Sequence, residues 1–174
     1  MPDTLAAAIR TVPDFPKPGI AFKDLTPILA DPGRFAEAIA LLSEPWAQAG
    51  VTHVVGMDAR GFWFGPSLAA HLGAGFVPAR KPGKLPAETI ATTYTLEYGE
   101  DTLELHADAF GADARVLIHD DVIATGGTAA AACDLVRQLG ATVVGCSFFL
   151  ELAFLSGRDR LPDGVPMNAV LRVE

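Results

Sequence analysis

The feature that most constrains the fold is an apolar run followed by two acids and a glycine-rich turn. The apolar run 116–118 leads to the adjacent acids Asp120 and Asp121. The turn 125–128 (the Thr-Gly-Gly-Thr turn) then opens an alanine-rich segment, 129–139. Such an apolar run is typical of a buried strand, and the alanine-rich segment is typical of a helix. The stretch therefore predicts a strand, a turn and a helix in immediate succession.

The Thr-Gly-Gly-Thr turn has the composition of an anion site. A helix N-terminus presents unpaired N–H groups and partial positive charge, which suit a phosphate. Gly126 and Gly127 let the backbone approach an anion, and Thr125 and Thr128 add hydroxyl donors. Because no Lys precedes the threonine, the turn differs from the loop that binds nucleoside triphosphates. With two acids nearby, a sugar phosphate fits best; the alternative is an ordinary strand–turn–helix connection with a capped helix.

The segment 120–128 resembles the phosphoribosyl pyrophosphate (PRPP) motif of the type I phosphoribosyltransferases. The resemblance implies an α/β fold with a mostly parallel central sheet flanked by helices, an N-terminal hood and a flexible flap. It also implies that the two acids anchor the ribose hydroxyls while the turn binds the 5′-phosphate. The residues implied to bind PRPP or AMP are Asp120, Asp121, Ala124, Thr125, Gly126, Gly127 and Thr128.

Composition limits the class of protein. A chain of 174 residues, half hydrophobic and 20% charged, fits one globular domain, residues 1–174. With 13 basic and 21 acidic residues the formal charge is −8, which argues against broad nucleic-acid binding. There is no evident secretory signal and no apolar run long enough for a bilayer. We therefore expect a cytoplasmic protein with neither nucleic-acid nor membrane partners.

A second anion site is predicted after the strand 53–57. Asp58, Ala59, Arg60 and Gly61 combine an acid, a small residue, a guanidinium and a glycine at a strand end, which suits a pyrophosphate. The sequence resembles the family's pyrophosphate loop, in which the peptide corresponding to 58–59 is often cis. The alternative for Arg60 is a structural salt bridge.

A basic, Pro/Gly-rich stretch follows the strand predicted over 75–80. It resembles the start of the family's flap, placed here at roughly 81–104, which closes on pyrophosphate; the alternative is a solvated loop. The resemblance implies that Arg80 and Lys81 act across the interface of a homodimer. The implied pyrophosphate-binding residues are Asp58, Ala59, Arg60, Arg80, Lys81 and Lys84.

The proline-rich segment 12–27 is unsuited to a helix and suggests a loop laid over another surface. It resembles the hood, roughly 11–30, of the adenine-using members of the family. That resemblance implies that Phe22 stacks on the purine while the backbones of Ala21 and Lys23 read its edge. The alternative is that Phe22 fills the core. The family often has Arg at the position of Lys23, so this chain has no planar guanidinium there.

Three further residues are named by resemblance or by position. The segment 94–99, within a predicted hairpin, resembles the adenine-using members and implies that Glu97 exchanges a proton with the purine. Glu151 follows an apolar strand and is placed either at the base pocket or at the structural end of that strand. His119 stands where relatives have an aliphatic residue, so it is either an inert strand residue or one that tunes the neighbouring carboxylates.

The resemblance as a whole implies transfer of the 5-phosphoribosyl group of PRPP to N9 of adenine, which gives AMP and pyrophosphate. The implied catalytic residues are Glu97, Arg60 and Lys84. Mg²⁺ is expected to accompany the substrate, held mainly by phosphate and ribose oxygens rather than by protein ligands. Two alternatives remain: a 6-oxopurine (hypoxanthine, guanine or xanthine) as acceptor, or a noncatalytic regulator that binds PRPP or a nucleotide.

Overall fold

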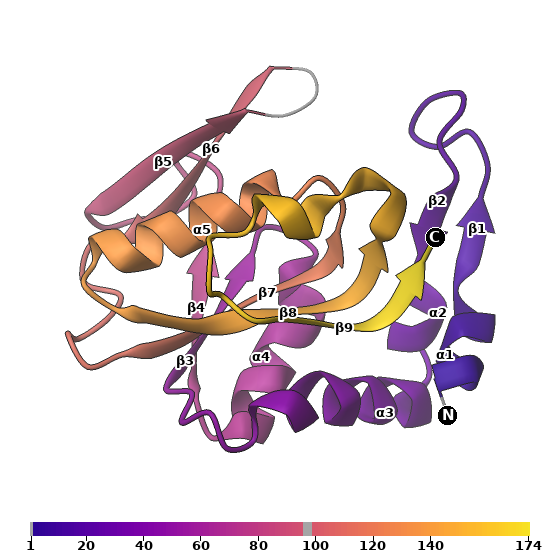
Figure 1. Ribbon diagram of the computed structural model, residues 1–174, viewed down its shortest axis with the longest axis horizontal. Coiled ribbons are helices and arrows are strands. Elements are labelled where there is room, and N and C mark those ends of the chain that lie inside the picture. The colour runs from indigo at the N-terminus through magenta and orange to yellow at the C-terminus, as the bar shows by residue number, and fades with distance from the viewer. Residues whose placement is uncertain (1, 96–98) are drawn as a thin grey trace.

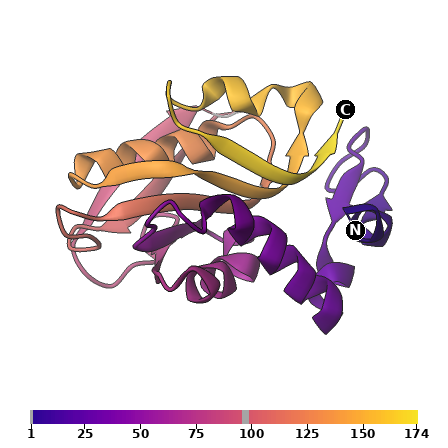
Figure 2. The same cartoon turned by 60° about the horizontal axis from the view of Figure 1, so that its bottom comes forward.

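A five-stranded sheet forms the centre of the protein. The computed structural model describes residues 2–95 and 99–174 (Figure 1). The strand order is β4-β3-β7-β8-β9, and every neighbouring pair is parallel. Helices α3 and α4 cover one face and α5 covers the other (Figures 1 and 2). The strands are β3 His53–Met57, β4 Gly75–Ala79, β7 Arg115–Ile123, β8 Thr142–Leu152 and β9 Met167–Val173, and the helices are α3 Pro32–Ser43, α4 Gly61–Leu72 and α5 Gly127–Gln138. The expected fold class is confirmed.

Burial of β8 and two apolar clusters explain why the sheet is stable. Both faces of β8 are buried from Gly145 to Glu151, as expected for a parallel strand between two layers of helices. One apolar cluster lies between the sheet and α5, and a second lies between the sheet and the pair α3 and α4. Fully burying one large apolar side chain contributes about 1.5–3 kcal/mol, so these two clusters dominate the stability of the fold.

Strand β7 continues beyond the point at which the sequence pattern placed its end. An apolar run followed by two acids predicts a strand that ends at the acids, but β7 extends to Ile123. Val122 pairs with Leu150 and Ile123 pairs with Glu151 of β8, which keeps the backbone extended past the carboxylates. The acids therefore lie within the strand, where the sheet holds their backbone rigidly.

Helix α3 begins as its sequence predicts and ends earlier. The side chain of Asp31 accepts a hydrogen bond from the backbone N–H of Arg34 at 2.9 Å, and Pro32 occupies the first helical position. The sequence, with Asp31 as a cap and Pro32 in the first turn, predicts a helix over 31–48. It stops at Ser43 because Pro45 cannot continue the hydrogen-bond ladder, and a 3₁₀ turn, η1 (Glu44–Trp46), follows.

The N-terminal region contains more regular structure than a loop. Residues 12–27 were expected to lack it, yet the antiparallel pair of β1 and β2 spans both ends of the proline-rich turn. Arg10 forms an ion pair with Asp24 at 3.5 Å across this pair. The prolines between the strands are confined to the connection, where no ladder hydrogen bond is needed. The elements are α1 Pro2–Ala8, β1 Arg10–Val12, β2 Phe22–Asp24 and α2 Thr26–Leu29.

A separate two-stranded hairpin packs beside α5 (Figure 1). It carries Leu103 and Leu105 into the cluster under α5. Within residues 2–95 and 99–174, no helix has both the length and the apolar character needed to cross a membrane. The hairpin strands are β5 Thr89–Thr95 and β6 Glu100–His106, and the remaining 3₁₀ turns are η2 Ala153–Leu155 and η3 Gly157–Arg160.

Candidate active site

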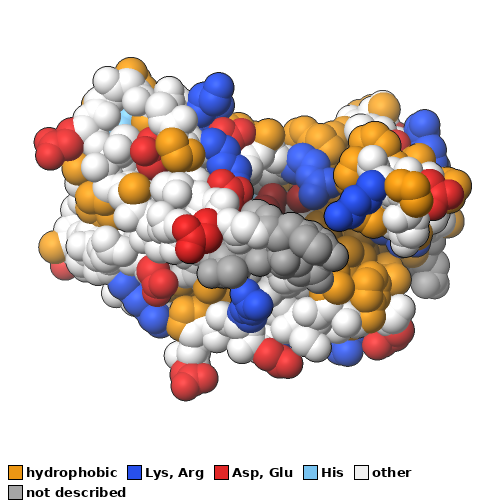
Figure 3. All heavy atoms as spheres, turned by 90° about the horizontal axis from the view of Figure 1, so that it is seen from above, with side chains coloured by type: hydrophobic (Ala, Val, Ile, Leu, Met, Phe, Trp, Pro, Cys, Tyr) orange, Lys and Arg blue, Asp and Glu red, His pale blue; other side chains and the backbone are white. Residues whose placement is uncertain are grey.

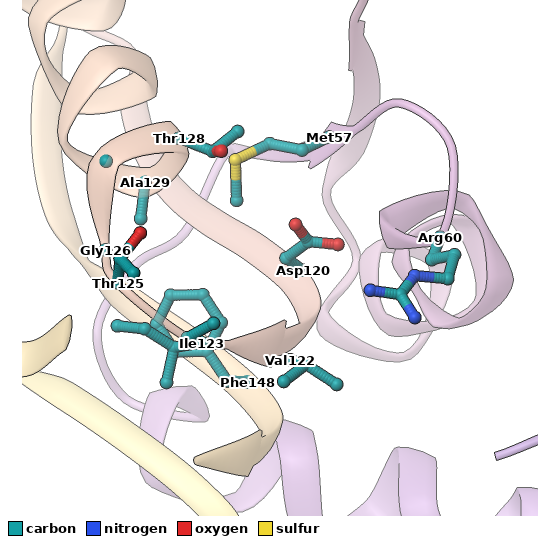
Figure 4. A pocket seen from close by; sticks show the side chains of 12 residues that line it. Met57, Arg60, Asp120, Val122, Ile123, Thr125, Gly126, Thr128, Ala129 and Phe148 are labelled. Carbon is teal, nitrogen blue, oxygen red and sulfur yellow. The ribbon is translucent and has the colours of Figure 1, made fainter. Parts of the chain in front are cut away.

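A cavity of about 230 Å³ lies where β7 leads into α5. Figure 4 shows Asp120 pointing into the space between the Thr-Gly-Gly-Thr turn and Arg60. Seen from above, Asp and Glu side chains lie in a hollow with Lys and Arg side chains on either side (Figure 3). The lining residues are Met57, Arg60, Asp120, Val122, Ile123, Ala124, Thr125, Gly126, Gly127, Thr128, Ala129 and Phe148. Six of the seven residues predicted to bind PRPP or AMP thus share one cavity with Arg60.

The Thr-Gly-Gly-Thr turn forms a cradle at the N-terminus of α5. Gly126 precedes the helix with φ +79°, a left-handed conformation that glycine adopts without a steric penalty. The first N–H groups of a helix have no partner within the helix, so those of α5 are available to an anion in the cavity. The hydroxyls of Thr125 and Thr128 flank the same space.

A second glycine supports the cradle from outside. A Cβ at Gly157, in η3, would lie 2.2 Å from the carbonyl oxygen of Ala124. A Cβ at Gly126 would lie 2.1 Å from the carbonyl oxygen of Gly157. The backbones of the two loops therefore touch, and neither position has room for a side chain. Sequence reasoning missed Gly157 because the contact joins segments about thirty residues apart.

The two adjacent acids have different surroundings. Asp120 lines the cavity, and its Oδ1 accepts a hydrogen bond from the N–H of Asp121 at 2.9 Å. The side chain of Asp121 is 1% exposed and lies 3.3 Å from Nε of Arg60. Burial, followed by repulsion from Asp121, raises the pKa of Asp120 well above its ordinary value. Burial also raises the pKa of Asp121, and the Arg60 guanidinium opposes that shift. Asp120 can therefore contact a ligand in the cavity directly, whereas Asp121 is buried against Arg60.

Arg60 connects the cavity with the N-terminal region. It stands immediately before α4, forms the ion pair with Asp121 and keeps 40% of its side chain exposed. Its guanidinium lies 5.3 Å from the centre of the Phe22 ring, within the range of a cation–π interaction. The predicted salt bridge exists, but the exposed remainder of the guanidinium can still meet an anion. Both interpretations of Arg60 are therefore compatible with the structure.

The loop before α4 also engages the basic stretch. Nε of Arg80 donates to Oδ2 of Asp58 at 3.0 Å, and the Arg80 guanidinium lies 5.8 Å from the Phe62 ring. The Asp58–Ala59 peptide is cis, as it often is in the family that the loop resembles. Because β3 and β4 are neighbours, Asp58 and Arg80 are brought together at their ends.

Lys81 is held by the β5–β6 hairpin. Its ammonium donates to the Tyr94 hydroxyl at 3.1 Å and also to Oδ2 of Asp101. Burial would lower the pKa of Lys81, but the hydrogen bonds with Asp101 and Tyr94 raise it above its usual value. Burial would raise the pKa of Asp101, but the Lys81 ammonium holds it below its usual value. Lys81 therefore stays charged while its ammonium is held by Tyr94 and Asp101 of the hairpin.

Two predicted catalytic residues are less constrained by the structure. Lys84 is exposed, and its ammonium has no partner within the described part of the chain. Glu97 lies outside the described residues. The roles predicted for both residues stay predictions.

The N-terminal hairpin places Phe22 close to the cavity. Its ring packs edge to face against Phe15, with 5.1 Å between the ring centroids, and the Arg60 guanidinium lies over one face of the ring. Neither apolar cluster of the described residues includes Phe22, which disfavours the alternative that it fills the core. The Lys23 ammonium donates to the Thr11 hydroxyl at 3.0 Å, so this side chain is used within the hairpin. Ala21 is exposed beside them.

Glu151 and His119 are both engaged in internal contacts. Arg158 donates to the two carboxylate oxygens of Glu151 at 2.8 and 3.2 Å, and this lowers the pKa of Glu151. That pairing favours the structural role for Glu151. Nδ1 of His119 bonds the carbonyl of Ser147 at 2.9 Å, so Nδ1 carries the proton. Burial lowers the pKa of His119 to about 4, which leaves the ring neutral near pH 7.

The residues of the cavity are compatible with a cation that arrives with a phosphorylated ligand. Within residues 2–95 and 99–174, no group of three or more His, Cys, Asp or Glu side chains could hold a metal ion. Among the described residues that line the cavity, Asp120 is the one that supplies a carboxylate. Mg²⁺ is commonly bound through one or two carboxylates together with substrate phosphates, and this donor set fits that pattern.

Comparisons of sequence and of structure with known proteins identify the same family of relatives. The family described as "Phosphoribosyl transferase domain" matches residues 24–160. The adenine phosphoribosyltransferase of Synechococcus sp. (strain JA-2-3B'a(2-13)) is 56% identical over 168 residues, 96% of each chain. The crystal structure of the Rhodothermus marinus enzyme of that name superposes with a TM-score of 0.95 at 57% identity, covering 99% of this chain and 98% of that one. The Saccharomyces cerevisiae enzyme, solved with an imino-altritol bisphosphate and adenine, gives 0.92 at 44% identity and 98% coverage of both chains.

Proposed function

This chain belongs to the phosphoribosyltransferase family, among the adenine phosphoribosyltransferases, and from that premise we propose how its residues carry out the reaction. The reaction transfers the 5-phosphoribosyl group of PRPP to N9 of adenine and releases pyrophosphate, leaving AMP. It is a glycosyltransfer that serves purine salvage. The yeast relative was crystallised with adenine, which supports the same acceptor here.

One observation carries the proposal: a single cavity combines an anion cradle, a carboxylate and a guanidinium. The Thr-Gly-Gly-Thr turn supplies helix N–H groups for the 5′-phosphate, and Asp120 lies beside it for the ribose hydroxyls. Arg60 stands on the opposite side, at the end of the neighbouring strand β3. A ligand with a phosphate, a sugar and a second anionic group in sequence matches this order.

Departure of pyrophosphate leaves negative charge that the protein must stabilise. Arg60 provides a fixed guanidinium at the cavity, and Arg80 and Lys84 lie on the segment that follows β4. Preorganised charge of this kind acts on the transition state, where the charge develops, more than on the bound substrate. Asp58 orients Arg80 through the 3.0 Å hydrogen bond, and Ala59 leaves the loop without a further side-chain donor.

The sugar becomes positively charged as the bond to pyrophosphate breaks. A carboxylate in a partly enclosed site interacts strongly with that charge, because little water screens it. Asp120 would bind the ribose hydroxyls directly, and Asp121 would act beside it through its ion pair with Arg60. The raised pKa of Asp120 means that its negative charge is unfavourable without a ligand, and a cationic sugar would relieve this cost.

The acceptor base would be held by the N-terminal hairpin. Phe22 offers a ring face to a purine, and the backbones of Ala21 and Lys23 offer polar groups at its edge. We assign proton exchange with the purine to Glu97, a step that typically contributes roughly 10²–10⁴-fold to the rate. Closure of the hood (11–30) and the flap (81–104) over the substrates would keep water from the activated ribose.

Mg²⁺ and a second subunit complete the proposal. Mg²⁺ bound to the PRPP oxygens would neutralise charge on the leaving group, with Asp120 as the neighbouring protein carboxylate. Arg80 and Lys81 would act across the interface of a homodimer. The cytoplasmic setting stays a prediction from the sequence.

The acceptor is tested by incubating the protein with PRPP, Mg²⁺ and one purine at a time, and measuring the nucleotide formed. AMP from adenine is the expected product. A preference for hypoxanthine, guanine or xanthine would assign the chain to the 6-oxopurine enzymes instead. Binding of PRPP without turnover of any purine would favour the noncatalytic alternative.

A further inference from the structure

The hydroxyl group of Tyr94 joins three segments that are far apart in the sequence. It lies 3.1 Å from the Lys81 ammonium, 3.3 Å from Oδ2 of Asp101 and 3.2 Å from Oγ1 of Thr128. Lys81 follows β4, Asp101 belongs to β6, and Thr128 belongs to the Thr-Gly-Gly-Thr turn. The reaction described above gives Tyr94 no role.

The chemistry of these groups sets the direction of each hydrogen bond. An ammonium group can only donate, and a carboxylate can only accept. The Tyr94 oxygen therefore accepts from Lys81, and the Tyr94 hydrogen goes to Asp101. The remaining lone pair of Tyr94 accepts from the hydroxyl of Thr128. All the hydrogen-bonding capacity of the Tyr94 hydroxyl is thus in use, and the single hydroxyl hydrogen of Thr128 is committed to Tyr94.

A phosphate in the cradle competes for that hydrogen. Its oxygens accept hydrogen bonds, and Thr128 lines the cavity in which it would lie. Once Thr128 donates to the phosphate, two outcomes are available to Tyr94. Either its oxygen loses the bond from Thr128, or its hydrogen turns to Thr128 and leaves Asp101. In the first case the cluster of Lys81, Tyr94 and Asp101 loses its connection to Thr128, and in the second it loses the hydrogen bond from Tyr94 to Asp101.

We propose that Tyr94 is a positioning residue that couples phosphate in the Thr-Gly-Gly-Thr turn to the placement of Lys81. This inference rests on the proposed function, because it assigns the cradle to a 5′-phosphate and Lys81 to pyrophosphate. Without a ligand, the cluster retains Lys81 on the β5–β6 hairpin. Phosphate in the cradle loosens the cluster and makes the ammonium available to pyrophosphate.

The coupling is measured by titrating pyrophosphate into the protein in Mg²⁺ buffer, with and without saturating ribose 5-phosphate. The ratio of the two dissociation constants reports the coupling. In the unaltered protein, ribose 5-phosphate should tighten pyrophosphate binding about fivefold or more, the low end of common coupling between sites. Tyr94→Phe should bring the ratio close to one. It should also leave the affinity for ribose 5-phosphate unchanged or tighter, because Thr128 is released to the phosphate.

Thr93→Val is the matched control. Thr93 lies next to Tyr94 on β5, and its exposed hydroxyl lies 3.0 Å from that of Thr102 across the hairpin. This variant removes a hydroxyl from the same strand without touching the cluster, so it should keep the coupling ratio of the unaltered protein. Asp101→Asn gives an independent measurement if Tyr94→Phe does not fold. Asp101→Asn should tighten pyrophosphate binding in the absence of ribose 5-phosphate and reduce the ratio.

The results separate this inference from the proposed function. If both ligands bind but the ratio is one in the unaltered protein, or persists in Tyr94→Phe, the coupling is overturned and the function stands. Weaker ribose 5-phosphate binding in Tyr94→Phe would make Tyr94 a structural support only. If the unaltered protein binds neither ligand, the proposed function and the coupling both fall.

Discussion

Replacing Gly157 with alanine tests whether η3 sets the shape of the phosphate cradle. An added Cβ would lie 2.2 Å from the carbonyl oxygen of Ala124, whereas real Cβ atoms keep at least 3.0 Å from such an atom. The backbones must therefore separate by about 0.8 Å. Two hydrogen bonds from Arg158 to Glu151 tie η3 to the end of β8. Because η3 is held in this way, the Thr-Gly-Gly-Thr turn must take part of the displacement.

The size of the effect follows from that displacement. Overpacking of this kind typically costs about 1–3 kcal/mol of stability, and each kcal/mol lowers the Tm of a domain of this size by about 2–4 °C. A shift near 1 Å in groups that position a substrate can reduce activity by up to about 100-fold. Because the role proposed for the turn is to bind PRPP before reaction, we expect the KM for PRPP to rise more than kcat falls. Steady-state kinetics and thermal unfolding measure both effects.

Gly111→Ala is the control for this substitution. A Cβ at Gly111 meets no atom within 4 Å, and, like Gly157, it does not have the positive φ that disfavours alanine. We expect Gly111→Ala to keep the KM and the Tm of the unaltered protein. A Gly157→Ala protein with unchanged KM for PRPP and unchanged Tm would refute the argument that backbone contact with η3 shapes the cradle.

Three further substitutions test the site. Asp120→Asn should lower kcat by roughly 10–100-fold, the worth of a hydrogen bond to a charged group. The pKa of Asp120 is raised in the folded protein, so the native state loses stability as the pH rises above the pKa of Asp120 in the unfolded chain. The Tm of Asp120→Asn should therefore exceed that of the unaltered protein by an amount that grows from pH 5 to pH 8. A lower Tm for the variant would contradict this. Phe22→Ala should raise the KM for adenine about tenfold, the worth of one stacked base, with little change for PRPP; equal changes would argue against stacking. The pKa of His119 is lowered from 6.5 to about 4 in the folded protein, so between pH 6.5 and pH 4 the unfolded chain binds more protons than the native state. The free energy of unfolding therefore falls as the pH drops through this range, by roughly 3 kcal/mol at most. His119→Val should lose this sensitivity in urea unfolding at pH 5 and pH 7, and an unchanged pH–rate profile would remove the hypothesis that His119 tunes the carboxylates.

Local patterns in the sequence predict the main elements of the fold. The strand His53–Met57 has the predicted bounds, and Asp31 caps α3 as its position before Pro32 indicates. Both signals depend on neighbouring residues alone: an apolar run flanked by polar residues, and a capping side chain next to a proline. The alternation of such elements indicates a parallel sheet, and the acids and the glycine turn then fall at its ligand-binding edge.

Contacts between segments that are far apart in the chain could not be predicted from the sequence. Phe148 lines the cavity because β8 pairs with β7 in a register that sets Phe148 opposite Asp120. The pairing of β1 with β2 was missed because each strand has only three residues. The ion pair of Asp121 with Arg60 likewise depends on β3 lying next to β7. No local pattern specifies a register or a neighbour across the sheet.

The adjacency of β3 and β7 has a consequence for ligand selection. Neighbouring strands are held about 4.8 Å apart by their hydrogen bonds, and the two loops proposed to bind anions leave these two strands at the same edge of the sheet. The separation between the loops is therefore a property of the rigid sheet, and movement of the surrounding loops changes it little. If the proposed function holds, we expect the site to select ligands by the distance between their two negatively charged ends, and a ligand with only one such end to occupy only half of it.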